Sequence, residues 1–184
     1  ISKLLTEMLD GRRSDLLGEG DATFEALCDY ADKVGGTLYA AAAIIEHDDL
    51  SKIGQKAARQ LGSAWAMLGL IRALPHSWQT NATPITDDMK PGMQSTEAAD
   101  ANALLQPVIK KMAAFIEEQR VEAVSALGKI PKKESSVLLL SKQITFYQKA
   151  LEMAGNNPFE MVRYEPSKLK KMIRLFWAKI IRRY

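Results

Sequence analysis

Apolar residues recur every three to four positions along most of the chain, which is the spacing of amphipathic α-helices. Glycine, proline and polar residues separate the stretches that follow this pattern. The stretches predict helices over residues 2–16, 23–45, 50–74, 96–128, 135–153 and 166–183. The alternation of apolar and polar residues that marks a β-strand is not sustained anywhere. We therefore predict an all-α bundle of about six helices, a single domain over residues 1–184 whose C-terminal part, residues 166–184, is a basic amphipathic helix.

The helix over residues 50–74 should lie at the centre of the bundle, because its middle is apolar on nearly every face. Asp48 or Asp49 is expected to cap its N-terminus, and Pro75 is expected to end it. His47 beside the two aspartates also suggests a metal site. A helix cap accounts for these residues without a ligand, so we predict no metal here.

Two adjacent glycines, Gly35 and Gly36, interrupt the helix predicted over residues 23–45. Glycine inside a helix costs about 0.5–1 kcal/mol relative to alanine, so the pair needs a reason to be there. Small residues let another helix, or a ligand, approach the backbone closely. We prefer the first interpretation, a kink or tight helix contact, and the second stays open.

Composition favours helices, since only 7% of the residues are aromatic while alanine, leucine, lysine, glutamate and methionine recur throughout. The single cysteine, Cys28, cannot form an internal disulfide, which suggests a reducing compartment, and its place on an apolar stripe suggests a small buried side chain. The longest uncharged apolar stretches fall well short of the roughly 20 residues that span a bilayer. The chain starts at Ile1, inside a predicted helix, and so reads as processed or truncated. Nucleotide-binding glycine motifs, GxSxG, HExxH and CxxC do not occur, so the common enzyme classes lose their usual support.

Positive charge is concentrated at the C-terminal end. The net charge is +3, yet residues 168–183 contain no acidic residue. The basic residues there are Lys168, Lys170, Lys171, Arg174, Lys179, Arg182 and Arg183. A mildly acidic body therefore ends in a cationic helix.

The same helix carries a continuous apolar stripe. Its members are Leu169, Met172, Ile173, Phe176, Trp177, Ile180 and Ile181. This is the pattern of a helix lying on an anionic membrane surface, with the seven cations and Trp177 as the membrane-contacting candidates. Packing of the stripe against the bundle is the alternative. Nucleic acid is not expected as a partner, since no recognised binding fold accompanies the basic residues.

Five segments follow one another along the chain in a familiar order: MLDGRRSDL, FEALCDYADKVGGTLY, AARQLGSAWAMLGLIRAL, a helix ending in AGNNPF, and PSKLKKMIRLFWAKIIRRY. Together they resemble the squalene/phytoene synthase family of head-to-head prenyl synthases. The residues that match the family's patterns are Tyr30, Val34, Gly36 and Thr37 in the second segment and Leu61, Gly62, Ala64 and Arg72 in the third. The resemblance implies an isoprenoid-synthase-like helical fold.

Enzymes of that family carry two Asp-rich motifs, whose carboxylates hold the Mg²⁺ ions that neutralise a departing diphosphate. Here Ala73 and Ser77 stand where the aspartates of the second motif would fall, and Gly69 stands where its asparagine would fall. We therefore assign no catalytic residue and no cofactor. Mg²⁺ would be required only if the chain were an enzyme.

The first Asp-rich motif should lie upstream of Ile1. Asp10 and Asp15 are the nearest carboxylates. Five positions apart on a helix, they point about 140° away from each other and cannot jointly hold one ion.

The segment LGSAWAMLGLIRALPHSW is particularly similar to a degenerate branch of the family, which includes a mitochondrial complex I assembly factor and bacterial relatives. This similarity implies a non-catalytic role in assembling a respiratory membrane complex, with the complex's subunits or other assembly factors as partners. The implied location is the matrix face of the mitochondrial inner membrane, or the bacterial cytoplasm, peripheral to the membrane.

Two other functions stay open, a divergent prenyltransferase acting on farnesyl or geranylgeranyl diphosphate and a carrier that binds an isoprenoid. For these, the candidate pocket residues are Tyr30, Gly36, Tyr39, Trp65, Gly69 and Arg72, with Met67 as a further lining residue of a carrier. A carrier requires a cavity there, whereas an interior filled by these side chains would argue against it.

Overall fold

A computed structural model of the chain describes residues 1–17, 23–79 and 98–181. The α-helices are α1 (Ser2–Leu17), α2 (Phe24–Ala31), α3 (Thr37–Glu46), α4 (Lys52–Gln79), α5 (Ala98–Ser125), α6 (Leu139–Met153) and α7 (Lys168–Ile181). A π-helical turn, η1 (Asp32–Gly36), joins α2 to α3 without a break, and 3₁₀ turns occupy η3 (Leu127–Lys129), η4 (Lys132–Leu138) and η5 (Met161–Tyr164). Within the described ranges there is no strand. The prediction of an all-α bundle of about six helices is confirmed, because α2, η1 and α3 together form the single helix expected over residues 23–45.

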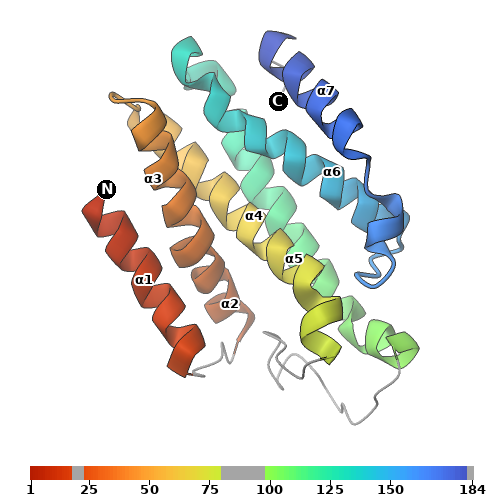
Figure 1. The fold of residues 1–184 in the computed structure, drawn as a ribbon. Coiled ribbons are helices and arrows are strands. Elements are labelled where there is room, and N and C mark those ends of the chain that lie inside the picture. Colours follow the sequence, from red (N-terminus) through yellow and green to blue (C-terminus); the bar gives the residue numbers. More distant parts are fainter. Residues whose placement is uncertain (18–22, 80–97, 182–184) are drawn as a thin grey trace.

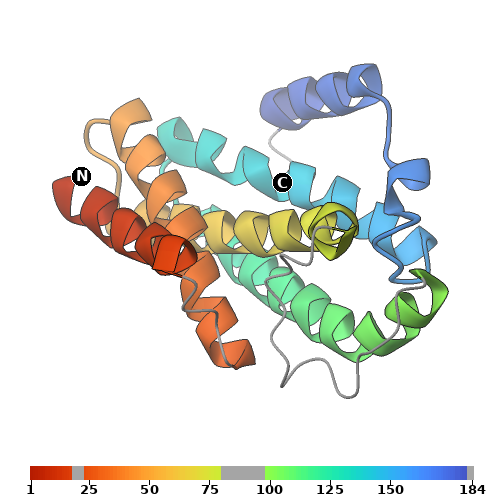
Figure 2. The ribbon, with the colours of Figure 1, turned by 60° about the horizontal axis from the view of Figure 1, so that its bottom comes forward.

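Helix α4 runs through the middle of the bundle (Figure 1). It packs against α3 and η1 on one side and against α5 and α6 on the other. Helix α1 covers α3 and η1 at one outer side, whereas α7 lies along α6 at the opposite outer side (Figures 1 and 2). α7 therefore lies at the outer edge of the bundle, in contact with α6.

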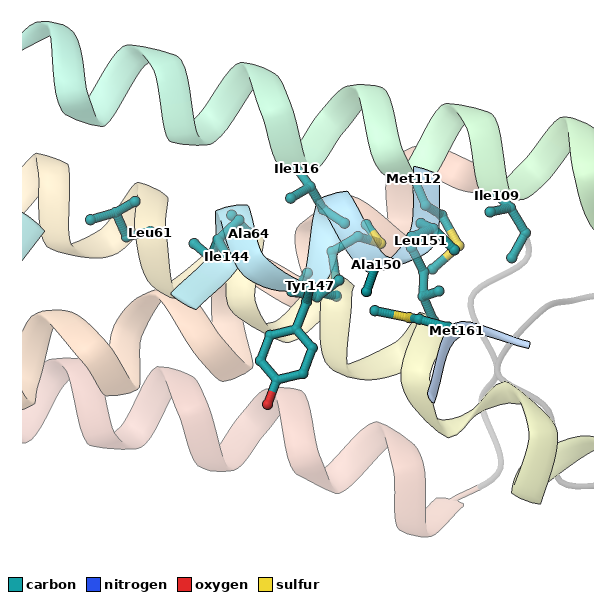
Figure 3. Close-up of a cluster of buried hydrophobic side chains, with 14 of the residues drawn as sticks. Leu61, Ala64, Ile109, Met112, Ile116, Ile144, Tyr147, Ala150, Leu151 and Met161 are labelled. Carbon is teal, nitrogen blue, oxygen red and sulfur yellow. The ribbon is translucent and has the colours of Figure 1, made fainter. Parts of the chain in front are cut away.

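Fully buried side chains of α4 form the centre of the core, as the apolar middle of this helix predicts. They contact apolar side chains of α5, α6 and η5, part of which Figure 3 shows. The α4 contributors include Leu61, Ala64, Met67, Leu68, Ile71 and Leu74, and those from the other helices include Ile109, Met112, Ile116, Ile144 and Leu151. Removing this apolar area from water is the main favourable contribution to folding.

The two adjacent glycines lie where η1 crosses α4. A Cβ atom placed on Gly35 would collide with Ala66 Cβ and with the backbone carbonyl of Gly62. A Cβ atom on Gly36 would lie 2.6 Å from Ser63 Oγ. The backbones thus touch where the side chains are only hydrogens, and the interpretation of the pair as a tight helix contact is confirmed.

Charged groups on three elements meet beside this crossing. Arg59 of α4 forms ion pairs with Glu7 of α1 and with Asp32 of η1, the latter at 2.6 Å. Hydrogen bonding to Asp32 and to Glu7 raises the pKa of the Arg59 guanidinium. Ser63 Oγ donates to Asp32 Oδ1 at 2.9 Å. This network fixes α1 and η1 against α4.

Two local predictions about α4 are wrong. The helix begins after Ser51, whose Oγ accepts a hydrogen bond from Gly54 N at 3.1 Å, so Ser51 and not Asp48 or Asp49 occupies the capping position. Ser51 holds this position because Glu134 of η4, which is 1% exposed, accepts hydrogen bonds from Ser51 N and Oγ at 3.1 and 2.6 Å. The cap is thus set by a contact 83 residues away in sequence.

The second wrong prediction concerns the end of the helix. Pro75 lies inside α4, which continues to Gln79. Proline removes only one backbone hydrogen bond, and the following turn carries Trp78, which packs against the core. Partial burial of the Trp78 side chain favours this turn and so opposes the cost of the proline.

In the described part of the chain, no helix is both long and apolar enough to cross a bilayer.

Candidate functional site

A cluster of aromatic and charged side chains joins α4, α6 and α7 around Tyr147 of α6. The ring of Trp65, from α4, meets the Tyr147 ring edge-on, with the ring centroids 5.6 Å apart. Arg72, also from α4, places its guanidinium carbon 4.2 Å from the centroid of the Tyr147 ring. Lys171 Nζ, from α7, lies 4.5 Å from that centroid and donates a hydrogen bond to the Tyr147 hydroxyl at 2.9 Å. In Figure 3 the Tyr147 ring projects away from the other labelled core side chains, with its hydroxyl outermost.

Glu165, from the segment before α7, completes the Tyr147 cluster. Its two carboxylate oxygens lie 3.4 Å from Arg72 Nε and 3.4 Å from Lys171 Nζ. The hydrogen bond to the Tyr147 hydroxyl, together with Glu165, raises the pKa of the Lys171 ammonium group. Both cations are therefore held by one carboxylate and one ring, and the cluster anchors the start of α7 to the bundle.

Trp65 and Arg72 are thus the predicted pocket residues that the structure brings together. Tyr30 lies elsewhere, on α2, and its hydroxyl accepts a hydrogen bond from Arg12 Nη1 at 2.8 Å. Tyr39 of α3 donates its hydroxyl to the carbonyl oxygen of Val137 at 2.9 Å. Burial raises the pKa of the Tyr39 hydroxyl, which keeps it protonated.

Two further pocket candidates, Gly36 and Met67, lie in closely packed regions. Gly36 is in close contact with α4, and Met67 is fully buried in the core. Gly69, in contrast, is exposed, and a Cβ atom placed on it would meet nothing within 4 Å. Side chains fill the interior at Gly36, Tyr39 and Met67, so an isoprenoid cavity centred on these residues gains no support.

The face of α4 that would carry the second Asp-rich motif offers no carboxylate. Gly69 and Ala73 are exposed there, and Ser77 Oγ donates to the carbonyl oxygen of Leu74. Among residues that the structure describes, no three His, Cys, Asp or Glu side chains lie close enough together to hold a metal ion. The donors on this face of α4 therefore do not fit Mg²⁺, which requires oxygen ligands.

The apolar stripe of α7 points into solvent. Six of its members are each between 47% and 67% exposed. They are Leu169, Met172, Ile173, Phe176, Trp177 and Ile180. Packing of the stripe against the bundle is therefore excluded for these six residues.

Helical geometry explains this exposure. Successive residues of an α-helix are about 100° apart around the axis, which places the stripe opposite Ala178. Ala178 is 4% exposed and faces the bundle. On the same geometry, Lys168 and Lys179 border one edge of the stripe, and Lys170 and Arg174 border the other. The exposed apolar face is thus flanked by cations on both sides.

Lys171 is an exception among the membrane-surface candidates, because it faces the bundle and belongs to the Tyr147 cluster. Lys168, Lys170, Arg174, Trp177 and Lys179 are exposed on α7. The remaining two candidates, Arg182 and Arg183, lie outside the described residues.

A groove of about 320 Å³ runs between α6 and α7. Its lining residues are Lys142, Thr145, Phe146, Lys149, Arg174, Trp177 and Ala178. The guanidinium carbon of Arg174 lies 5.6 Å from the centroid of the Phe146 ring. The groove is therefore both cationic and aromatic, and one of its walls continues into the exposed stripe at Trp177.

Sequence reasoning missed Tyr147, Glu165 and the α6 side of this groove. Phe146 and Tyr147 lie in a predicted helix, but periodicity alone does not distinguish a core aromatic residue from one that binds a cation. The only available signal was the adjacent pair of aromatic residues flanked by Lys142 and Lys149.

The family model described as squalene/phytoene synthase matches residues 1–173. No curated protein and no solved structure matches the chain.

Proposed function

Because the chain belongs to the squalene/phytoene synthase family, we propose that it is a non-catalytic member that works at a membrane surface, in assembling or scaffolding a respiratory complex similar to complex I. One observation carries the membrane part of this proposal. The apolar stripe of α7 is exposed and bordered by cations, while the opposite face of α7 packs on α6.

A helix of this kind suits the boundary between lipid headgroups and acyl chains. Full burial of each large apolar side chain contributes about 1.5–3 kcal/mol, and each cation near an anionic surface contributes about 1 kcal/mol. Trp177 has the amphipathic ring that favours the headgroup level. The Tyr147 cluster supports the proposal further, since it holds α7 in a fixed orientation with the stripe outward.

The non-catalytic part rests on the exposed face of α4. Activation of a prenyl diphosphate needs Mg²⁺ held by carboxylates, and Gly69, Ala73 and Ser77 stand at the corresponding positions. Arg72, the matching arginine of the family pattern, is paired with Glu165 and stacked on Tyr147. Arg72 therefore contributes to the anchoring of α7, and the positions of the motif's asparagine and aspartates supply no ligand for a metal ion.

The assembly role rests on the similarity of LGSAWAMLGLIRALPHSW to the degenerate branch of the family. Its partners would be respiratory-complex subunits or assembly factors, and its location the matrix face of the mitochondrial inner membrane or the bacterial cytoplasmic side. Co-purification from the membrane fraction tests this part. Recovery of respiratory-complex subunits with the protein supports the role, and their absence when the membrane-bound protein is recovered intact contradicts it.

Product analysis tests the non-catalytic part. The purified protein is incubated with farnesyl and geranylgeranyl diphosphates and Mg²⁺, beside a known synthase as positive control. We expect no turnover. A head-to-head C30 or C40 product would show a prenyltransferase, and a stoichiometric complex with an unreacted isoprenoid would favour the carrier.

Vesicle binding tests the membrane part. Replacing Phe176 and Ile180 of the stripe together with serine should abolish co-sedimentation with vesicles that contain phosphatidylglycerol, because these side chains would insert. Since both are exposed, the free energy of unfolding should change little.

The matched control is Leu38→Ser/Ile45→Ser on α3. These two side chains are 51% and 68% exposed. This control should bind vesicles as the unmodified protein does. Equal loss of binding in the two variants would mean that general surface hydrophobicity, and not α7, causes the association.

A further inference from the structure

A second groove, of about 480 Å³, lies between the first turns of α4 and the end of α5, and we call it the α4–α5 groove. One wall carries Lys52, Lys56 and Gln60, which follow at intervals of four residues and so share one face of α4. The other wall carries Lys129 of η3. Because α6 lies between α5 and α7 (Figures 1 and 2), this groove is separate from the apolar stripe of α7.

The three lysines of the α4–α5 groove place unpaired ammonium groups around one space. None of these groups forms an ion pair or a hydrogen bond with any residue that the structure describes. Glu122 also lines the groove, and its carboxylate accepts a hydrogen bond from the Gln60 amide. The described wall thus has three positive charges and one negative charge. Like charges four residues apart on a helix repel each other, so a negatively charged ligand would be favoured here.

The surface between these charges is apolar. Ile53, Ala57 and Ala126 line it, and Ile53 is 41% exposed. Since Ile53 and Ala57 directly follow Lys52 and Lys56, an apolar strip runs beside the cationic one along α4. A ligand that fills the groove would bury apolar area as well as pair with the lysines.

These groups suit an acidic segment of a protein better than a compact phosphate. The cations in the described wall are lysines, which act as point charges and lack the planar fork with which arginine binds two phosphate oxygens. Glu122 would repel a compact anion. In contrast, its carboxylate and the Ser125 hydroxyl can accept hydrogen bonds from the N–H groups of a peptide.

We propose that the α4–α5 groove docks an acidic, partly apolar segment of a partner protein. Carboxylates of the segment would pair with the three lysines, and an apolar side chain would lie against Ile53. The inference rests on the proposed assembly or scaffolding role and gives that role a docking surface. Because the groove is separate from α7, the protein would hold its partner while the stripe of α7 contacts the membrane.

The docking groove is also distant from the positions of the second Asp-rich motif. At about 1.5 Å per residue, Lys56 lies about 25 Å along α4 from Ala73. Substitutions in the groove therefore leave that face of α4 and the Tyr147 cluster unchanged.

The test compares two pairs of lysine substitutions with the same change in charge. The groove variant is Lys56→Gln/Lys129→Gln, with one change in each wall. The control variant is Lys132→Gln/Lys133→Gln, which changes exposed lysines of η4 that do not line the groove. Fluorescence anisotropy measures the affinity for a short fluorescein-labelled peptide of glutamate and leucine. Two further peptides replace every glutamate by glutamine or every leucine by serine.

The unmodified protein should bind the glutamate–leucine peptide more tightly than either altered peptide. The groove variant should lose at least about fivefold more affinity for it than the control does, the ratio that corresponds to about 1 kcal/mol. Ile53→Ser should weaken binding of the leucine-containing peptide and leave binding of the serine-containing peptide unchanged, because only the first has side chains that contact the apolar strip.

Equal losses in the two lysine variants would overturn the groove site, as would no binding of the peptide by the unmodified protein. Either result leaves the membrane contact of α7 standing, since Phe176 and Ile180 test that contact separately. If the peptide binds in the groove but respiratory-complex subunits do not co-purify, the groove site is supported and the assembly role fails. Circular dichroism checks folding, and if the groove variant unfolds, Lys129→Gln is compared with Lys133→Gln under the same criterion.

Two other ligands are distinguished with the same variants. The groove variant should co-sediment with phosphatidylglycerol vesicles as the control does, and a selective loss would mean that the groove faces lipid, which overturns the docking of a protein segment. Inorganic phosphate is titrated without peptide, and weak or undetectable binding is expected. Tight phosphate binding that the groove variant abolishes would identify a small anion as the ligand and overturn the proposal.

Discussion

Replacing Gly62 with alanine would test the contact between η1 and α4. Gly62 lies in the middle of α4, facing Gly35 of η1. A Cβ atom at Gly62 would overlap the carbonyl oxygen of Gly35, lie 2.9 Å from its carbonyl carbon and lie 2.8 Å from Tyr39 Cβ. Two of these three atoms are backbone, and the third is fixed directly to backbone, so no side-chain rotation relieves the overlap. The two helical segments must move apart.

The expected loss of stability follows from two opposing effects. Overpacking a well-packed contact costs about 1–3 kcal/mol, and a rigid backbone obstacle places Gly62→Ala at or above the upper end of this range. The separation also weakens neighbouring contacts, because a gap of about 0.5–1 Å removes a quarter to a half of the van der Waals attraction between each pair of contacting atoms. Alanine has a higher helix propensity than glycine, which adds back about 1 kcal/mol to the free energy of unfolding. We expect a net loss of about 2–3 kcal/mol in the free energy of unfolding.

Gly69→Ala is the matched control, the same substitution in the same helix. Gly69 is exposed, and a Cβ atom there meets nothing within 4 Å, so only the propensity effect remains. This variant should gain about 0.5–1 kcal/mol. Urea unfolding followed by far-ultraviolet circular dichroism measures the free energy of unfolding. In thermal unfolding, the melting temperature of Gly62→Ala is expected to fall by about 4–12 °C. A Gly62→Ala protein as stable as Gly69→Ala would refute the close backbone contact.

Three further outcomes follow from other contacts. Glu134→Ala should lower the free energy of unfolding by about 1–3 kcal/mol in urea unfolding, because Ser51 N and Oγ lose the buried carboxylate that accepts their hydrogen bonds. Glu134→Gln should lose less, and equal losses would contradict the capping contact. Tyr147→Phe keeps the ring but removes the hydroxyl that accepts a hydrogen bond from Lys171. It should lower the free energy of unfolding by about 0.5–1.5 kcal/mol and speed the hydrogen exchange of α7 amides. Unchanged exchange in α7 would mean that the hydroxyl does not anchor this helix. Burial and the nearby carboxylates raise the pKa of the Cys28 thiol from 9.0 to about 11. Because the thiolate is the reactive form, iodoacetamide at neutral pH should alkylate Cys28 about 100-fold more slowly in the folded protein than in the urea-unfolded chain. Equal rates would contradict the raised pKa.

The fold was largely predictable from the sequence, because it follows from local periodicity. Repeating apolar positions locate the helices, and the uniformly apolar middle of α4 predicts its burial. The glycine pair predicts a close helix contact but does not identify the partner, which is α4. Local patterns failed at the two ends of α4, where the distant residue Glu134 fixes the cap and packing of Trp78 carries the helix past Pro75.

The candidate site was less predictable, because it depends on which surfaces meet. The sequence by itself determined that α7 has an apolar stripe and many cations, since both are properties of a single helix. Only the tertiary structure decided that the stripe faces solvent and that Lys171 faces the bundle. Only the tertiary structure brings Arg72, Tyr147 and Glu165 together from three separate segments. The physical reason is that periodicity assigns residues to a face, whereas long-range packing decides what that face contacts.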